Sequence, residues 1–236
     1  MCFGGRLSYI MLGSSGVPVE SVSASGNFEV GGPDRKAVGF SKDSCVTFLD
    51  WDDTLFASSH IALLLKDSED LGGEVEEGLQ SLQLAVIGLL KVASKISRVF
   101  IVTNANLVWV NEVLERWMPK VATYMHRNSV RVLSSRDFHE LTHPGSPHLW
   151  KLRAFKDVLA ILKYTSGKAD NIIVVGDGLE EKEAASQLSQ SERDCIVKMV
   201  GIPKSLSIES LVRQLALLTM SFRGIWASRK CMSIDL

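Results

Sequence analysis

Three aspartates follow directly on an apolar stretch whose residues favour a β-strand. The stretch is Cys45-Val46-Thr47-Phe48-Leu49, and Asp50, Asp52 and Asp53 come immediately after it. Two like charges about 4 Å apart repel by roughly 4 kcal/mol at an effective dielectric constant of about 20, so this cluster needs a nearby cation or a bound proton. Carboxylates in such a place can bind a divalent metal, attack an electrophile or transfer a proton. An acidic turn or a helix N-cap is the simpler alternative.

Other apolar, strand-like stretches also end in polar side chains. Thr103 and Asn104 follow residues 98–102, and Asp177, which stands between two glycines, follows residues 171–175. In a parallel sheet the carboxyl ends of the strands meet at one edge, and ligands bind there. We therefore expect these groups to lie close to the three aspartates.

The elements that must position these residues alternate between strands and helices. Strands are predicted near residues 45–49, 98–104, 129–133, 171–175 and 195–201, each an unbroken run rich in Val and Ile. Helices are predicted over 75–95, before Pro119, over 150–163, from Glu180 and over 208–220. Buried parallel strands with helices between them predict an α/β fold: a three-layer, doubly wound, mostly parallel, five-stranded, Rossmann-like sheet.

The chain divides into one predicted domain and two tails. Residues 1–44 are rich in Gly and Ser and show no sustained period, which predicts a flexible or partner-ordered N-terminal tail. Residues 45–222 form the predicted core, and residues 223–236 an irregular C-terminal tail. The intervals from Asp50 to Thr103 and from Thr103 to Lys151 are filled by predicted core elements, so no separate lid domain fits between them.

Composition restricts the partners and the location. The 236 residues carry a net charge of -1, so charge gives no case for binding nucleic acid or an anionic membrane. The four cysteines lack metal-finger spacing, which suits a reducing compartment. The most apolar stretch, Leu84 to Ala93, is short for a bilayer span and contains Lys91. We expect an intracellular, cytoplasmic protein with no membrane segment and no secretory signal; an organellar location stays open.

From residue 45 to about residue 220 the chain resembles the haloacid dehalogenase (HAD)-like superfamily of aspartate-nucleophile phosphatases, in its capless form. The first family motif, D-x-D-x-T after a strand, matches residues 50–54. The second, a strand that ends in Thr or Ser, matches Thr103. The third and fourth, a Lys at a helix start and a strand that ends in Gly-Asp with an acid nearby, match Lys151 and Gly176-Asp177 with Glu180 or Glu181.

The resemblance implies a role for each of these residues. Asp50 would attack phosphorus and form an aspartyl-phosphate that water then hydrolyses, while Asp52 would protonate the leaving oxygen and later deprotonate the water. Thr103 and the amide of Asn104 would bind the phosphoryl oxygens. Lys151 would neutralise the phosphoryl group and hold Asp50.

The implied site takes one of two lysines and a metal ion. Lys156 lies on the same helix as Lys151, but five residues correspond to about 140° around a helix, so both cannot face the site, and the helix start favours Lys151. Magnesium would be held by Asp50, the main-chain carbonyl of Asp52, Asp177, and Glu181 or Glu180, because hard oxygen ligands around a phosphate select it over zinc.

Two residues depart from the family pattern, one in charge and one in side-chain length. Asp53 stands where many members have Gly, which adds a charge beside Asp52, and a glutamate replaces the more usual second aspartate after Asp177.

Because no lid fits, an open site favours a phosphorylated protein or another large substrate. The alternative is a catalytically weak or inactive HAD-like domain that serves as a binding or assembly module in a protein complex, with partner proteins on its tails.

Other interpretations fit less well. A receiver domain would place its phosphoacceptor after the third strand, where this chain has Ser134-Ser135-Arg136, and no P-loop or GxGxxG motif is present. His139, His143 and His148 lie in a proline-containing segment without a nearby thiol, which favours loop histidines over a zinc site.

Overall fold

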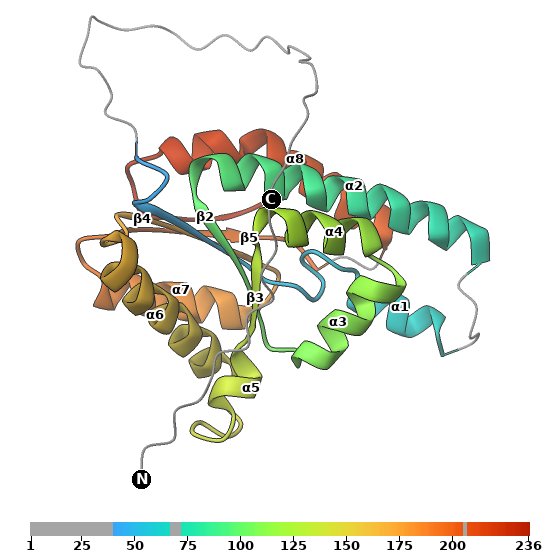
Figure 1. Ribbon diagram of the computed structural model, residues 1–236, viewed down its shortest axis with the longest axis horizontal. Coiled ribbons are helices and arrows are strands. Elements are labelled where there is room, and N and C mark those ends of the chain that lie inside the picture. The colour runs from blue at the N-terminus through green and yellow to red at the C-terminus, as the bar shows by residue number, and fades with distance from the viewer. Residues whose placement is uncertain (1–39, 67–71, 205–206) are drawn as a thin grey trace, which may run out of the picture.

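Six parallel strands form one sheet at the centre of the molecule (Figure 1), in a computed structural model that describes residues 40–66, 72–204 and 207–236. The spatial order is β3-β2-β1-β4-β5-β6. Every neighbouring pair is parallel, and β1 and β4 are fully buried. The strands are β1 (Cys45–Leu49), β2 (Arg98–Thr103), β3 (Arg131–Ser134), β4 (Asn171–Gly176), β5 (Ile196–Gly201) and β6 (Met232–Asp235).

Helices cover both faces of the sheet and make a three-layer α/β structure (Figure 1). On one face lie α1 (Ser58–Leu64), α2 (Gly72–Ile96), α3 (Leu107–Arg116), α4 (Pro119–Asn128) and α8 (Ile208–Ala227). On the other lie α5 (Ser135–His139), α6 (Pro147–Ser166) and α7 (Leu179–Ser191). Side chains of β1 alternate between the faces: Leu49 packs toward α2, whereas Phe48 stacks on Phe155 of α6 with ring centroids 4.4 Å apart.

Helix α2 is long and apolar enough to cross a membrane by length and composition alone. It runs over 25 residues and extends beyond the predicted range 75–95 at both ends. One side of it is buried in the protein core against the sheet and α8, and the buried residues recur at helical spacing: Leu79, Leu82, Gln83, Val86, Leu89, Leu90 and Ala93.

The structure differs from the sequence prediction in four elements. The sheet has six strands instead of five, because the segment 223–236, expected to be irregular, continues α8 to Ala227 and then adds β6 beside β5. Helices α1, α4 and α5 were not predicted. The helix predicted to stop before Pro119 does so, since α3 ends at Arg116, and Pro119 opens α4 at a position where its missing N–H costs nothing. Residues 1–39 of the predicted N-terminal tail lie outside the described residues.

The strand order sets where a ligand can bind. β2 and β3 lie on one side of β1, and β4, β5 and β6 lie on the other, so the connections leave β1 and β4 in opposite directions. In doubly wound sheets of this order ligands bind beyond the carboxyl ends of the strands at that switch point. Asp50 follows β1 and Asp177 follows β4, so two predicted site residues flank it.

Candidate functional site

A tight loop after β1 sets the positions of the first aspartates. The N–H of Asp50 still donates to the carbonyl of Val175 at 2.9 Å, so Asp50 is held at the edge of the sheet. The carbonyl of Trp51 then accepts the N–H groups of Leu55 and Phe56, at 2.8 Å and 3.0 Å. This closed loop allows the carboxylates of neighbouring residues to point in different directions.

Asp53 does not add its carboxylate to the cluster in the way its position in the sequence suggested. Its φ of 52° lies in the left-handed region, which aspartate tolerates better than most residues. Its carboxylate accepts from the main-chain N–H of Ser59 at 2.8 Å and from the Ser59 hydroxyl. Asp53 therefore anchors the start of α1, with Lys204 3.9 Å away.

Lys151 lies between two acids that come from different elements. It stands near the start of α6 and is 2% exposed, and its Nζ donates both to Asp50 Oδ1 and to Glu181 Oε1. Burial alone would lower the pKa of Lys151, but the charges of Asp50 and Glu181 raise it above its ordinary value. A buried ammonium with two carboxylate partners remains charged, so it can neutralise an anion bound beside Asp50.

Glu181, not Glu180, is the acid that faces the site. Its Oε2 accepts from the main-chain N–H of Gly178 at 2.9 Å, while its other oxygen meets Lys151. Gly176 makes room for it, because a Cβ there would lie 2.3 Å from Glu181 Cγ. With both oxygens engaged, the carboxylate of Glu181 orients Lys151 and the first turn of α7.

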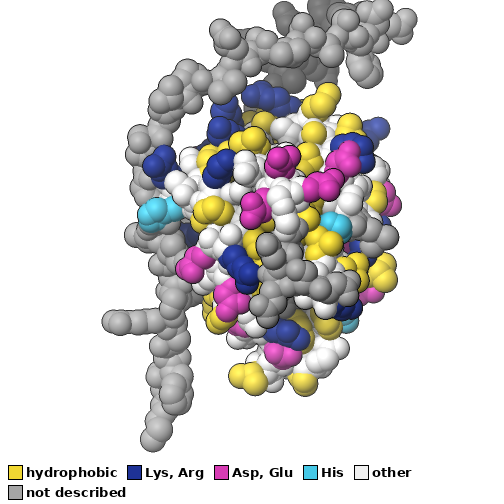
Figure 2. Space-filling model, turned by 90° about the vertical axis from the view of Figure 1, so that its right-hand side faces the viewer, with side chains coloured by type: hydrophobic (Ala, Val, Ile, Leu, Met, Phe, Trp, Pro, Cys, Tyr) yellow, Lys and Arg dark blue, Asp and Glu magenta, His cyan; other side chains and the backbone are white. Residues whose placement is uncertain are grey.

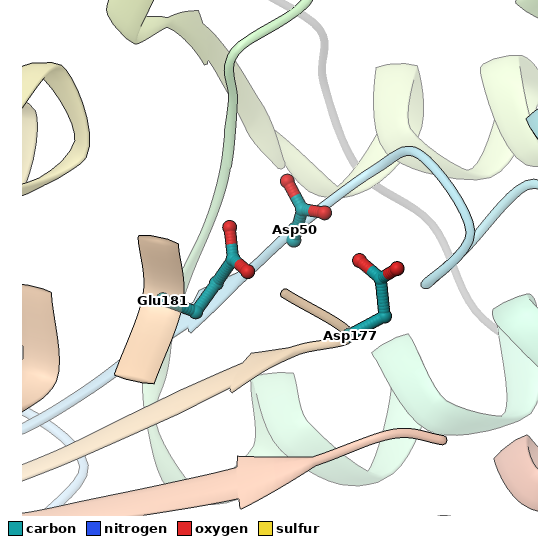
Figure 3. A group of neighbouring side chains, drawn as sticks. All are labelled: Asp50, Asp177 and Glu181. Atoms are coloured by element: carbon teal, nitrogen blue, oxygen red, sulfur yellow. The ribbon is translucent and has the colours of Figure 1, made fainter. Parts of the chain in front are cut away.

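The carboxylates of Asp50, Asp177 and Glu181 face a common space (Figure 3), and one oxygen of each lies within 4.8 Å of the others. Burial, with the charge of Glu181, raises the pKa of Asp50 to about 7 despite Lys151. Burial, with the charges of Glu181 and Asp53, raises the pKa of Asp177 to about 6. Negative charge at this edge exceeds the positive charge of Lys151, so the group fits a divalent cation that prefers oxygen ligands.

Asp52 lies at the centre of a second set of contacts. Its Oδ2 accepts from the hydroxyl of Thr103 at 3.3 Å. Its Oδ1 accepts from the Ser58 hydroxyl and, at 3.2 Å, from the indole Nε1–H of Trp109. The sequence prediction brought Asp52 and Thr103 together but missed Ser58 and Trp109. A serine pair directly after an acidic loop is a usable signal for a helix start, whereas nothing local identifies Trp109.

The side chain of Asn104 holds neighbouring elements together. Its Oδ1 accepts from the Ser135 hydroxyl, which also donates to the carbonyl of Thr103 at 2.8 Å. Its Nδ2 donates to the carbonyl of Pro147 at 3.5 Å. These contacts link the end of β2 to α5 and α6, and they already engage both polar atoms of the side-chain amide that sequence analysis assigned to phosphoryl oxygens.

The predicted site residues thus fall into two adjoining groups at the carboxyl edge of the sheet. One holds Asp50, Lys151, Asp177 and Glu181, and the other joins Asp52 to Thr103. The histidines do not converge: His139 pairs with Asp157 at 3.2 Å, and His148 approaches Glu183 at 3.6 Å.

In comparisons with known proteins, no protein-family model, curated protein or solved structure matches the chain.

Proposed function

We propose that the protein is a Mg²⁺-dependent phosphomonoester hydrolase of the HAD-like type that works through an aspartyl-phosphate on Asp50. The observation that supports this most is the convergence of Asp50, Lys151, Asp177 and Glu181 from three separate segments: the end of β1, the start of α6 and the β4–α7 connection. A crowded group of acids around one buried lysine is costly to assemble, and such perturbed groups cluster at functional sites.

In the proposed reaction Asp50 forms a bond to phosphorus while the bond to the leaving oxygen breaks. Asp52 gives that oxygen a proton, then takes one from the water that attacks the aspartyl-phosphate and releases phosphate from Asp50. Lys151 contacts Asp50 directly and would neutralise part of the phosphoryl charge. Thr103, through its hydroxyl, and Asn104, through its main-chain N–H, would bind phosphoryl oxygens.

Asp50, Asp177 and the main-chain carbonyl of Asp52 would hold Mg²⁺, with Glu181 beside them. Both Glu181 oxygens already accept N–H groups, so we expect its contact with the ion to pass through water. Bound there, Mg²⁺ supplies positive charge to the phosphoryl oxygens and lowers the repulsion between the carboxylates.

The surroundings of the site favour a large substrate. Between β1 and β2 the described chain forms only α1 and α2, and α2 belongs to the core. Acidic, basic and hydrophobic side chains are interspersed on the side of the molecule that carries α1 and α3 (Figure 2), so no single charge type selects the substrate there. Without a lid domain to exclude water, we propose a phosphoprotein or another large phosphate ester as the substrate.

The test is hydrolysis of p-nitrophenyl phosphate by the full chain, with and without Mg²⁺. We expect Mg²⁺-dependent turnover that Asp50→Asn lowers by about 10³-fold or more, because the nucleophile is lost. Asp194→Asn is the matched control, since this acid is exposed and pairs with Lys168 at 2.8 Å, away from the proposed site. An inactive wild type, or equal activity in Asp50→Asn, would overturn the proposal.

One observation favours a second function, that of a binding or assembly module. Lys151 already compensates charge on both Asp50 and Glu181, so part of the cluster is satisfied without an ion. The module predicts a folded protein that binds Mg²⁺ weakly or not at all and releases no phosphate. The enzyme predicts turnover, so the same assay separates them.

A further inference from the structure

The carboxylate of Asp52 is held by donors from three elements. Ser58 of α1 and Trp109 of α3 both donate to Oδ1, and Thr103 at the end of β2 donates to Oδ2. Two donors on one oxygen and a hydroxyl on the other define a single orientation of the side chain.

Trp109 is itself fixed in place. Its main-chain N–H donates at 2.8 Å to Asn106, the N-cap of α3. Its ring meets Phe56 and Trp117 edge-on, with centroids 6.5 Å and 6.2 Å away. Aromatic packing on two sides prevents the ring from turning, so the direction of its N–H bond is set by the core.

An indole N–H can donate a hydrogen bond but cannot accept one. Oδ1 of Asp52 already accepts two hydrogen bonds, and the indole of Trp109 could not accept a proton placed there, so any proton that Asp52 carries belongs on Oδ2. That oxygen is the one beside Thr103, at the end of β2 where the phosphoryl group is proposed to bind.

We propose that Trp109, assisted by Ser58, is a positioning residue that makes Oδ2 the oxygen through which Asp52 exchanges protons. This inference rests on the proposed function. In the first step the proton passes from Oδ2 to the leaving oxygen as its bond to phosphorus breaks. In the second step Oδ2 takes a proton from the attacking water, which restores the starting state.

The experiment compares two phosphate esters in Trp109→Phe, which keeps the ring and removes only the N–H. p-Nitrophenol leaves readily without a proton, whereas an alkyl alcohol needs one, and kcat/KM reports the step that forms the aspartyl-phosphate. For the alkyl ester we expect kcat/KM to fall about tenfold or more, part of the roughly 10²- to 10⁴-fold that acid–base catalysis supplies. For the aryl ester we expect a fall of no more than about threefold, since its leaving group needs little protonation.

Trp117→Phe is the matched control. Trp117 belongs to the same aromatic group, with its ring 5.8 Å from Phe56, and donates no hydrogen bond to Asp52 among the described contacts. It should change both esters equally. Ser58→Ala provides a second variant with the same selective loss on the alkyl ester, should Trp109→Phe fold poorly.

Each outcome is decisive. Equal losses on the two esters, or no loss, in both Trp109→Phe and Ser58→Ala overturn the positioning role while the hydrolase stands. A wild type that hydrolyses neither ester overturns the proposed function and this inference with it. The contact has its own readout: among the five tryptophan indole N–H signals, that of Trp109 should shift in Asp52→Asn and the others should not.

Discussion

Each edge of the sheet buries a lysine, but the two lysines have different partners. At the carboxyl edge Lys151 meets two carboxylates, and its pKa is raised above the ordinary value. At the amino edge Lys198 donates at 2.8 Å to the carbonyl of Trp226 and lies 5.2 Å from the ring centre of Phe40. No carboxylate pairs with Lys198 among the described residues, and burial lowers its pKa to about 8.

The difference lies in what each lysine stabilises. The carbonyl of Trp226 belongs to the last turn of α8, where the helix leaves carbonyl groups without partners and carries partial negative charge. Lys198 therefore completes a helix end, and the amide of Asn171 shares that carbonyl at 3.0 Å. Lys151 instead stabilises a group of acids that have no structural need to be together.

The largest expected effect is the loss of the charge at the carboxyl edge. Lys151→Met leaves two buried carboxylates without their ammonium, which should lower the free energy of unfolding by about 3–5 kcal/mol. Lys198→Met should stay within about 1 kcal/mol of wild type, because an apolar side chain replaces a charge with only neutral partners. Urea unfolding of the two variants measures this, and equal losses would remove the distinction between the edges.

Divalent metal should stabilise one edge only. Mg²⁺ at one hundred times its dissociation constant should add about 2.7 kcal/mol to the free energy of unfolding, provided that the unfolded chain does not bind it. Asp177→Asn should reduce this gain, whereas Lys198→Met should leave it unchanged. Thermal melts over a Mg²⁺ series give the answer, and a gain that survives in Asp177→Asn would place the ion elsewhere.

Gly176→Ala should disturb the same edge by steric means. The added Cβ would lie 2.3 Å from Glu181 Cγ, so the acid that orients Lys151 must move, at a cost of about 2 kcal/mol in the free energy of unfolding. Gly88→Ala in α2 is the control, since nothing lies within 4 Å of the new methyl group and alanine favours the helix by roughly 0.5–1 kcal/mol. Chemical unfolding of the pair should give changes of opposite sign.

The two edges should also differ in how stability depends on pH without metal. The folded chain binds protons on Asp50 and Asp177 more tightly than the unfolded chain from about pH 4 to 7, so this contribution to stability is lost as the pH rises through that range. The lowered pKa of Lys198 has the opposite result: stability rises with pH between about 8 and 10.5.

Two comparisons isolate these dependences of stability on pH. Wild type is compared with Asp177→Asn from about pH 4 to 7, and with Lys198→Met from about pH 8 to 10.5. Denaturant unfolding at a series of pH values measures them. Slopes of the same sign would contradict the assignment of charge at the two edges.

Much of the sheet follows from local sequence patterns. Runs such as Ile172-Ile173-Val174-Val175 have no polar side chain to place in water, so they predict buried strands whatever their neighbours are. The sixth strand could not be predicted in this way. In β6 half-buried and exposed residues alternate over four positions, and its pairing partner, β5, lies about thirty residues earlier in the chain.

The candidate site also has a part that the sequence predicts and a part that only the structure shows. The types and order of Asp50, Lys151 and Asp177 were enough to predict one group of polar residues at the carboxyl edge, because parallel strands bring their ends to a common edge. The choice of Glu181 over Glu180 depended on the exact rotation of α7, which one residue changes by about 100°.

Sequence by itself determined the alternation of strands and helices, the edge at which the acids gather and the candidates for their counter-charge, because these depend on periodicity and chain order. Only the tertiary structure decided that Asp53 turns away to anchor α1 and that Trp109 holds Asp52. Hydrogen bonds between side chains depend on directions and on distances of a few tenths of an ångström, and these are fixed when separate elements pack against one another.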